Sequence, residues 1–379
     1  MKFTTTQENI THAVQVASRI AKKHISLPLL ENVLLEVGDG YVEVAGTNLE
    51  IGIRKRIRAK VEKSGSSTVP AKLLSGFLGN IPGENTVSFE ERDGQIHIES
   101  GRYKADITAV SAEEFPLLPK PQEEGAVKWR VSAERFRDVA TKAMVCVAPN
   151  DVRLEFSGVY MQFEEQSLTL VSTDGFRLLE LVCPDVRSEG FQEGKQVIIP
   201  LRAVSEVVHA LSREEGDCTI TLEDGQVFFD INEELRIVSQ LVKGNFPEYT
   251  QIIPNSSHTV VDIHVEEVLR SVKLAGVFVS ESVSEVLFRI NVGEKTLELE
   301  SRGSGAGKNT SVLDLAFCEG EDQEIVFNPR YAADGFSLLA GEVCRMTLTD
   351  ASSPAVLGEM GEEKEIRKGL RYILMPIKK

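Results

Sequence analysis

The sequence predicts an α+β fold in which one domain-sized unit occurs three times. The prolines that open helices stand at Pro70, Pro200 and Pro329, 130 and 129 residues apart. Phe-Pro pairs close the first two copies at Pro116 and Pro247, 131 residues apart. A period of this length exceeds the roughly 20–50 residues of a solenoid repeat and matches a whole domain. We therefore expect three repeated domains, each with two helices packed on antiparallel sheets.

The first copy shows the order of elements. Apolar residues at helical spacing predict a helix over residues 7–23, with Thr5 or Thr6 as its cap. Alternating patterns and turn residues predict strands over residues 32–37, 41–45 and 50–59. Pro70 then opens a second helix, because proline is tolerated best in the first turn. A hairpin that turns at Asp93-Gly94 ends the copy.

The second and third copies repeat this order. A helix is predicted over residues 131–148 with Ser132 as its cap, and another begins at Pro200. In the third copy the helices lie over residues 265–275 and after Pro329. Polar, Pro-rich junctions predict linkers near residues 120–127 and 254–258. The predicted domains are residues 1–122, 127–254 and 258–379.

The composition limits the classes of function. The 379 residues include 42 Lys+Arg and 58 Asp+Glu, which gives a net charge of −16. Such a chain is repelled by nucleic acid as a whole, so any DNA contact requires basic residues segregated on one face. Its five cysteines are far apart and odd in number, which is typical of reduced thiols in the cytosol. The sequence has no long apolar run, so we expect a soluble, intracellular protein with no membrane contact.

No constellation of residues predicts catalysis. The six histidines are scattered, without short metal-ligand spacing. Residues 302–309 resemble a phosphate-binding loop, but Arg302 stands where the pattern needs glycine and Asn309 where it needs Ser or Thr. A Gly-rich hairpin loop is the better interpretation. Asp174 and Glu180 have no visible partner base. We therefore expect no catalytic residue, no metal and no cofactor.

Basic residues recur at matching places on the predicted helices of all three copies. They are Arg19, Lys22, Lys23, Lys72, Arg135, Arg137, Lys142, Arg202, Arg270, Lys273 and Arg330. Each is an ordinary solvated side chain when taken singly, and acidic residues share these helices. Their recurrence favours a second interpretation, in which basic helix faces hold a polyanion through phosphate contacts without reading bases.

The stretch from Leu168 to Leu179, LTLVSTDGFRLL, stands out in the middle copy. It predicts a strand, a Thr-Asp-Gly turn and a second strand. Gly175 permits the backbone of the turn, while Phe176 and Leu178 offer apolar surface. Arg177 is expected to present donors to a peptide carbonyl or carboxylate.

These features together resemble a known family. The threefold repeat, MKF at the start, and the motifs NDVR at 150–153, TDGFRL at 173–178, NFPEY at 245–249 and YILMPI at 372–377 are similar to the bacterial DNA sliding clamp, the β subunit of the replicative DNA polymerase III. The similarity spans the whole chain. It implies a non-enzymatic processivity factor in DNA replication, a head-to-tail ring of two chains with helices lining a hole for duplex DNA.

The resemblance also implies a groove that accepts short linear peptides. Its residues would be Phe156, Thr173, Gly175, Phe176, Arg177, Leu178, Pro247, Ile252, Pro354, Ile373, Leu374, Met375, Pro376 and Ile377. An apolar cleft of this kind is where the anchors of a peptide settle. Phe176 stands where the family often has histidine, so a more apolar groove is expected. Pro376 lacks an amide donor and is expected to leave the C-terminal segment open at a sheet edge.

Two further surfaces follow from the resemblance. The DNA-facing residues would be Arg19, Lys22, Lys23, His24, Lys72, Asn150, Arg153 and Arg202. The dimer would close through edge strands of the first and third domains, with Arg102, Lys104, Val277 and Phe278 at the interface. Residues 303–309 replace the acidic cluster expected opposite Arg102 and Lys104, so apolar contact is expected to carry more of the interface.

The implied partners are duplex DNA without sequence preference, a second copy of the chain, the DNA polymerase III alpha subunit, the clamp loader, and other polymerases or repair factors. The implied location is the cytoplasm, in association with the nucleoid. Two other classes remain open. A hydrolase using the Gly-rich loop would turn over nucleotide, and a multidomain scaffold without DNA would not be retained on closed circles.

Overall fold

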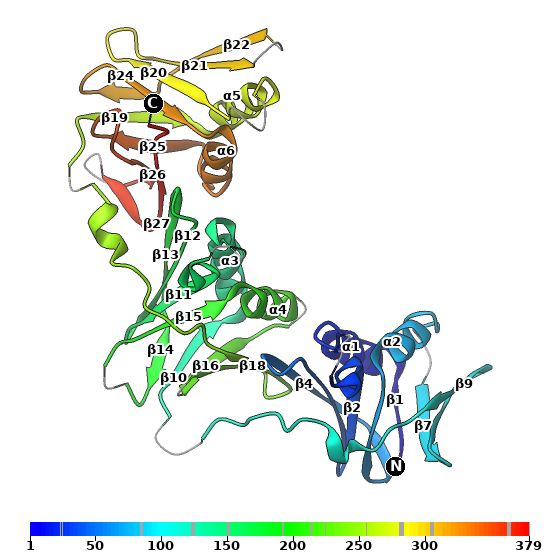
Figure 1. The fold of residues 1–379 in the computed structure, drawn as a ribbon. Coiled ribbons are helices and arrows are strands. Elements are labelled where there is room, and N and C mark those ends of the chain that lie inside the picture. Colours follow the sequence, from blue (N-terminus) through cyan, green and yellow to red (C-terminus); the bar gives the residue numbers. More distant parts are fainter. Residues whose placement is uncertain are drawn as a thin grey trace. The chain divides into compact units, whose positions relative to one another are not determined.

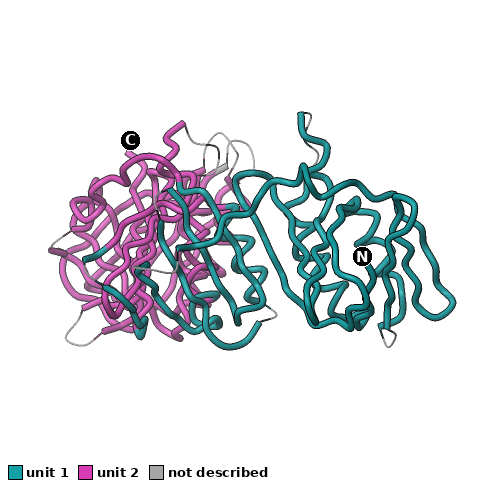
Figure 2. The backbone as a smooth tube through the Cα atoms, turned by 90° about the horizontal axis from the view of Figure 1, so that it is seen from below, with its two compact units in different colours: residues 1–137, 185–194, 202–241 teal, residues 138–184, 195–201, 242–379 magenta. Residues whose placement is uncertain are grey.

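The computed structural model of the protein describes residues 1–22, 24, 26–83, 86–122, 126–148, 150, 152–191, 193–212, 214–223, 225–254, 256–279, 284–303, 307–361 and 365–378. The chain divides into two compact units (Figure 2). The first unit contains residues 1–137, 185–194 and 202–241, and the second contains residues 138–184, 195–201 and 242–379. Within the described residues, each unit holds two antiparallel sheets, and the boundary between the units falls inside α3.

In the part of the chain that the structure describes, each predicted copy has two α-helices, in the expected order (Figure 1). They are α1 (Gln7–Ser18), α2 (Ala71–Gly79), α3 (Ala133–Ala143), α4 (Leu201–Leu211), α5 (Val265–Val277) and α6 (Pro329–Ser337). Short 3₁₀ turns are η1 (Pro28–Glu31), η2 (Ala112–Glu114), η3 (Met144–Cys146), η4 (Leu154–Phe156) and η5 (Tyr249–Ile252).

The predicted helix starts are confirmed more closely than the helix ends. The side chain of Thr6 caps α1 by accepting a hydrogen bond from the amide of Asn9. The helix ends at Ser18 rather than at residue 23, although Ile20 and Ala21 beyond it are buried. The helix predicted over residues 131–148 is shorter too, because the chain tightens into η3 after Ala143. The apolar residues at helical spacing therefore extend beyond the ends of the helices, because the irregular segments that follow also face the core.

In the first unit, one sheet has the order β5-β1-β7-β8-β9 and the other β14-β10-β16-β17-β18-β4-β3-β2-β6. The strands of the first sheet are β1 (Lys2–Thr6), β5 (Lys60–Lys63), β7 (Thr86–Arg92), β8 (Gln95–Ser100) and β9 (Tyr103–Thr108). Those of the second are β2 (Asn32–Val37), β3 (Tyr41–Thr47), β4 (Ile51–Arg58), β6 (Gly65–Pro70), β10 (Lys128–Ser132), β14 (Arg187–Glu189), β16 (Asp217–Glu223), β17 (Gln226–Ile231) and β18 (Leu235–Gln240). The turn at Asp93-Gly94 has positive φ at both residues, as predicted for a tight hairpin.

In the second unit, the sheets have the orders β15-β11-β12-β13-β27-β26-β25-β19-β23 and β22-β21-β20-β24. The first contains β11 (Gly158–Phe163), β12 (Ser167–Thr173), β13 (Arg177–Pro184), β15 (Lys195–Pro200), β19 (Thr259–His264), β23 (Phe317–Glu319), β25 (Val343–Leu348), β26 (Ala355–Met360) and β27 (Ile366–Leu374). The second contains β20 (Val286–Asn291), β21 (Thr296–Gly303), β22 (Gly307–Asp314) and β24 (Gln323–Phe327). Strands β21 and β22 pair up to Gly303 and Gly307, which confirms the hairpin predicted for the Gly-rich stretch.

Each nine-stranded sheet joins strands from two copies. In the first unit β4 of the first copy pairs with β18 of the second, a junction we call the first seam. In the second unit β13 of the second copy pairs with β27 of the third, which we call the second seam. The copies are therefore joined by backbone hydrogen bonds as well as by linkers, since both seams are antiparallel strand pairs.

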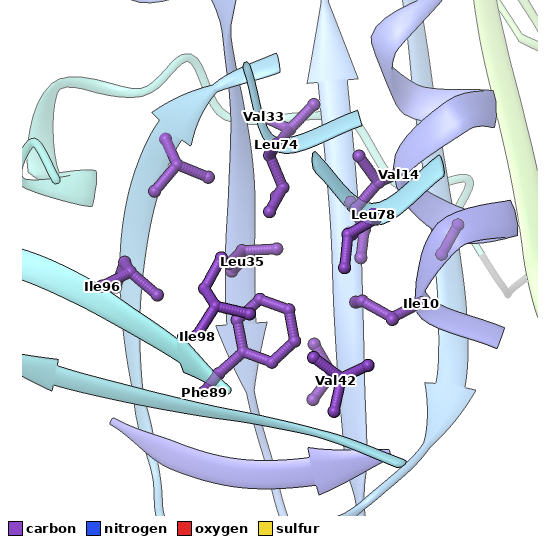
Figure 3. Packing of buried hydrophobic residues seen from close by; sticks show 14 of the residues in the cluster. Ile10, Val14, Val33, Leu35, Val42, Leu74, Leu78, Phe89, Ile96 and Ile98 are labelled. Carbon is purple, nitrogen blue, oxygen red and sulfur yellow. The ribbon is translucent and has the colours of Figure 1, made fainter. Parts of the chain in front are cut away.

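The core of the first copy lies between its helices and strands. Figure 3 shows Ile10 and Val14 of α1, Leu74 and Leu78 of α2 and Phe89 of β7 directed toward one another. The rings of Phe3 and Phe89 stack with their centroids 4.6 Å apart. The predicted packing of two helices on antiparallel strands is confirmed for this copy.

Candidate functional site

The turn between β12 and β13 is held by its own side chains. The Thr173 hydroxyl donates to the carbonyl of Arg177 (2.7 Å) and accepts from the amide of Gly175 (3.0 Å). Asp174 Oδ1 accepts from the amides of Phe176 (2.9 Å) and Arg177 (3.0 Å). Gly175 has a φ of +86°, which favours glycine. The locked turn leaves the Phe176 side chain 62% exposed, 6.3 Å from the ring of Tyr331.

The expectation that Arg177 presents donors to a peptide is wrong for this structure. Its Nε donates to Asp174 Oδ2 (2.9 Å), its Nη1 to Asp334 and its Nη2 to the carbonyl of Val145 (3.1 Å). The guanidinium also lies over the ring of Tyr331, 4.5 Å from the centroid. Arg177 is 8% exposed, so it ties β13 to α6 and η3 instead of facing solvent.

The expectation of an open C-terminal segment is also wrong. Strand β27 pairs with both β13 and β26, so it is not at an edge. Beyond it, the amide of Met375 donates to the carbonyl of Phe176 (3.0 Å) and the amide of Ile377 to the carbonyl of Val326 in β24 (2.8 Å). Pro376 lacks a donor, but the residues on either side supply one each. The segment therefore lies against the Phe176 turn, as a groove wall requires.

The floor of the groove is apolar and spans the second seam. Leu178 and Ile373 are directly opposed across β13 and β27, and both are buried with Tyr160, Val171, Ile198 and Val356. Leu374 is buried beside them, and Pro354 precedes β26 next to it. Met375 and Ile377 are half-buried, and Pro376 is buried. The structure thus brings the C-terminal candidates together with Phe176 and Leu178.

The segment between the second and third copies covers this floor. Phe246 stacks on Tyr160 with centroids 4.8 Å apart and lies 6.2 Å from Phe156. The predicted groove residues Pro247 and Ile252 flank this region and are exposed, Ile252 by 43%. The sequence reasoning did not single out Phe246, Tyr249 or Tyr331. The first two stand in the quoted NFPEY motif, which was a usable signal.

The predicted DNA-facing residues divide between the two units. In the first unit Lys22, His24 and Lys72 are exposed, and Arg202 is half-buried with an Nη2 atom that has no hydrogen-bond partner among the described residues. Arg19 forms an ion pair with Glu206 of α4 at 2.5 Å. Lys23 lies outside the described residues. DNA contact by these side chains stays a prediction.

In the second unit, Asn150 is exposed, and Arg153 lies beside the groove. Its guanidinium is 4.1 Å from the centroid of the Phe156 ring. A Cβ placed on Gly175 would lie 3.1 Å from Arg153 Nη2. Arg153 therefore lies beside the turn between β12 and β13. Its contact with DNA stays a prediction.

The predicted dimer residues lie near strands at sheet edges. In the first unit, β9 ends its sheet, Lys104 on it pairs with Glu99 (2.9 Å), and Arg102 lies in the preceding turn rather than on a strand. In the second unit, β22 ends its sheet. Val277 ends α5 and Phe278 is its C-cap, and Val277 is 76% exposed. Their place in a dimer interface stays a prediction. Phe278 lies against Gly307, at the start of β22.

Charges on β21 and β22 are neutralised within the second unit. Lys308 and Arg302 donate to Glu300 at 2.8 and 2.7 Å, and these hydrogen bonds lower the pKa of its carboxyl group. Among the described residues, no group of three or more His, Cys, Asp or Glu side chains has a metal-binding arrangement. In that same part of the chain, no helix has the length and apolarity needed to cross a membrane.

Comparisons with known proteins agree with this fold. Family models match in chain order: the N-terminal domain of the DNA polymerase III beta subunit over residues 1–119, the central domain over 130–248 and the C-terminal domain over 250–378. The beta sliding clamp of Vibrio cholerae is 26% identical over 379 residues, covering all of both chains. That of Chlamydia trachomatis is 26% identical over 94% of this chain and 84% of its own.

Solved structures show the same fold. The beta subunit of DNA polymerase III from Thermotoga maritima has a TM-score of 0.89 at 25% identity, covering 100% of this chain and 99% of that one. The sliding clamp from Pseudomonas aeruginosa has a TM-score of 0.90 at 22% identity, with the same coverage. Because the three family models follow one another along almost the whole sequence, the chain belongs to the DNA polymerase III beta subunit family.

Proposed function

We propose that the protein is the processivity clamp of a replicative DNA polymerase, a non-enzymatic ring of two chains that encircles duplex DNA and slides on it. The observation that carries the proposal is the succession of three beta-subunit domains in one chain with three repeated α+β copies. The domains we propose are residues 1–122, 127–254 and 258–379. Its place of action is the cytoplasm, at the nucleoid.

Binding by topology requires only modest DNA affinity. A protein that made many phosphate or base contacts would stall rather than slide. The net charge of −16 disfavours binding to the side of a duplex, while exposed basic residues such as Lys22, beyond the end of α1, and Lys72 of α2 accept the phosphates. Duplex DNA of any sequence is therefore the proposed ligand of the ring.

Retention on circular DNA tests this function. In this experiment the clamp loader places the purified chain on a nicked circular DNA duplex. The chain should stay on the DNA while it is circular and leave when the circle is cut into a linear duplex. Loss at the same rate from closed and cut circles would contradict a ring. Hydrolysis of nucleotide by the purified chain alone would favour a hydrolase that uses the Gly-rich loop. Absence of the chain from both circular and cut DNA would favour a scaffold that does not bind DNA.

Charge reversal tests the DNA-facing residues. Changing Lys22, Lys72 and Arg202 to Glu should lower retention, most clearly at low salt, and should make retention depend less steeply on salt, because fewer phosphates are neutralised. Lys22 and Lys72 are exposed, so their change should leave the thermal unfolding temperature nearly unchanged. Equal retention of variant and parent across a salt series would place the DNA elsewhere.

We propose that the two chains of the ring bind each other through β9 of one chain and the α5–β22 region of the other. Changing Val277 and Phe278 to Asp should give monomers, since burying unpaired charge costs several kcal/mol. Sedimentation velocity measures the mass. An unchanged dimer in the variant would exclude this interface.

The groove is proposed to bind short linear segments of the polymerase alpha subunit, the clamp loader and other polymerases or repair factors. A synthetic peptide with a glutamine and two apolar anchors should bind with a Kd of about 1 μM, which is about 8 kcal/mol at the standard state. The exposed Phe176 above the buried Leu178–Ile373 floor supports this assignment. Calorimetry with the parent chain tests it.

A further inference from the structure

The Arg177 side chain is held by residues from three other parts of the second unit. Its Nη1 donates to the carboxylate of Asp334 in α6, its Nη2 to the carbonyl of Val145 in η3 (3.1 Å) and its Nε to Asp174 Oδ2 (2.9 Å). The guanidinium also lies 4.5 Å from the centroid of the Tyr331 ring. We call these five residues the Arg177 cluster. Each guanidinium nitrogen has a partner inside the protein, so the cluster fixes this side chain in one position.

The helix that supplies Asp334 is itself fixed to the second seam. Tyr372 of β27 is fully buried, and its hydroxyl donates to the carbonyl of Tyr331 in α6 at 2.7 Å. A Cβ placed on Gly335 would lie 2.5 Å from the Tyr372 ring, so the glycine lets the helix approach the strand closely. Asp334 is therefore presented to Arg177 by a helix that rests on the neighbouring strand of the seam.

The Arg177 cluster controls the turn that carries Phe176. Asp174 uses one oxygen to accept from the amides of Phe176 (2.9 Å) and Arg177 (3.0 Å), and the other to accept from the guanidinium. The carbonyl of Phe176 accepts from the amide of Met375 (3.0 Å). The guanidinium thus orients the carboxylate that orients Phe176, whose side chain is exposed and whose carbonyl holds the C-terminal segment.

The matching turn of the first copy forms without such a cluster. The Thr47 hydroxyl donates to the carbonyl of Ile51 (3.0 Å), and Asn48 Oδ1 accepts from the amides of Glu50 (3.1 Å) and Ile51 (2.7 Å). The amide of Gln240 donates to the carbonyl of Glu50 (2.9 Å), as Met375 does to the second turn. Here Ile51 stands where the second copy has its arginine. Local side chains therefore suffice to form this turn, and the arginine of the second copy adds a connection to α6.

From this contrast we infer that Asp334 is a positioning residue of the partner groove: acting through Arg177, it holds the Phe176 turn in the geometry that accepts a peptide. The inference rests on the proposed function of that groove. A groove whose turn is in place in only a fraction of molecules binds with an apparent affinity reduced by that fraction. A helix of the third copy thus determines how well a turn of the second copy recognises a partner.

The variant Asp334→Ala tests the inference, because it removes the acceptor and places a good helix former in α6. The peptide with a glutamine and two apolar anchors is injected over immobilised chain, and the association and dissociation rates are measured. We expect the affinity to fall about threefold to tenfold, the range by which one lost hydrogen bond shifts an equilibrium. Slower association should account for most of the loss. Asp334→Asn keeps an acceptor without the charge, so its effect should be smaller.

Two controls isolate the role of the carboxylate. Glu298→Gln removes the carboxylate that Arg289 Nη1 contacts at 2.9 Å in the same unit, and it should change neither rate. Arg177→Gln should weaken binding, and its combination with Asp334→Ala should cost less than the sum of the single effects, since both act on one contact. Equal rates for parent and Asp334→Ala, or fully additive effects, would overturn the inference.

Hydrogen exchange tests the turn without any peptide. In Asp334→Ala the amides of Phe176 and Arg177 should exchange faster than in the parent, while those of residues 48–51 in the first copy should be unchanged. Unchanged exchange at Phe176 and Arg177 would overturn the inference. A parent chain that binds no peptide but shows the exchange difference would contradict the proposed peptide ligand alone, because Asp334 would still hold the turn.

Discussion

The two seams make the same backbone connection but differ in some of the side chains that face each other across them. At the first seam Arg54 of β4 faces Arg236 of β18, and each is neutralised by a carboxylate, Glu43 at 2.6 Å and Asp230 at 2.5 Å. At the second seam Leu178 faces Ile373 over an apolar floor, and the ion pair of Glu180 with Arg371 lies two residues further along the strands. Antiparallel pairing alone does not set the chemistry of a junction, because the side chains on its faces are chosen independently.

The linkers follow the same contrast. The first linker places Leu118 over Gly52, beside a polar hollow of about 880 Å³ lined by charged side chains of both signs. The second linker places Phe246 and Tyr249 on apolar floor residues. The second arrangement places the exposed Phe176 beside an apolar floor. The proposed peptide groove is therefore placed at the second seam.

The largest effect is expected from removing residues 375–379 at the second seam. Peptide binding should be lost, about 8 kcal/mol at the standard state for a micromolar ligand. The truncation also removes the Met375 and Ile377 amide bonds, so a loss of about 2 kcal/mol in unfolding free energy is expected. Calorimetry at a temperature where the truncated chain is folded decides the matter. If the truncated chain kept its affinity for the peptide, the C-terminal segment would not be part of the peptide groove.

A charge placed in the apolar seam should have the next largest effect. Ile373→Asp should lower the unfolding free energy by about 4 kcal/mol, since Ile373 is fully buried. The matched control Ile373→Val should cost about 1 kcal/mol. The single tryptophan, Trp129, belongs to the first unit, so its fluorescence should report a transition unaffected by either change. Circular dichroism should report the loss; equal urea midpoints for both variants would contradict a dry floor.

The charged seam should respond differently. Lys55 is 4% exposed and pairs with Glu214 at 2.8 Å, so Lys55→Met should cost about 3 kcal/mol by leaving a buried carboxylate unpaired. The double variant Lys55→Met with Glu214→Leu should recover most of this loss, because the second partner of Lys55, Glu234 at 3.4 Å, is 52% exposed and is solvated when left without Lys55. Here the Trp129 fluorescence transition in urea is the measurement. If the double variant were less stable than Lys55→Met, the interaction between Lys55 and Glu214 would depend on other contacts of these side chains.

The smallest effect concerns Thr221 on β16, which lines the polar hollow. Its buried hydroxyl has no hydrogen-bond partner among the described residues. Thr221→Val should therefore stabilise the first unit, by about 1 kcal/mol or less. That corresponds to a rise of about 2–4 °C or less in Tm for a unit of this size. The matched control Thr219→Val changes a half-buried neighbour and should have no such benefit. A lower Tm for Thr221→Val would reveal a partner for the hydroxyl.

Local features of the fold were predictable from sequence. Thr6 caps α1 and Asp93-Gly94 turns a hairpin because each depends on residues within a few positions. The repeat itself predicted the order of helices and strands. The candidate groove residues around Phe176 came from the resemblance, and the contacts among Phe176, Leu178, Ile373 and Met375 were found only in the structure.

Features set by distant residues were not predictable. Arg177 was interpreted as an open donor because its partner Asp334 lies 157 residues away in sequence. Lys55 falls on the same face of β4 as the buried Ile53 and Ile57, and its partner Glu214 lies 159 residues further on in sequence. In both cases a neighbouring copy supplies the carboxylate. A single-sequence pattern shows which residues are charged, but not which ones find partners in another copy.

The seams also impose a schedule on synthesis at the ribosome. Strand β4 ends at residue 58, but β18, which covers its free edge, begins at residue 235. At about 5–20 residues per second, that edge waits roughly 10–35 seconds for its partner. Strand β13 waits similarly for β27. An unpaired strand edge is a template for other chains. Nascent chains on neighbouring ribosomes therefore have time to exchange strands, and slowing translation should lengthen that exposure.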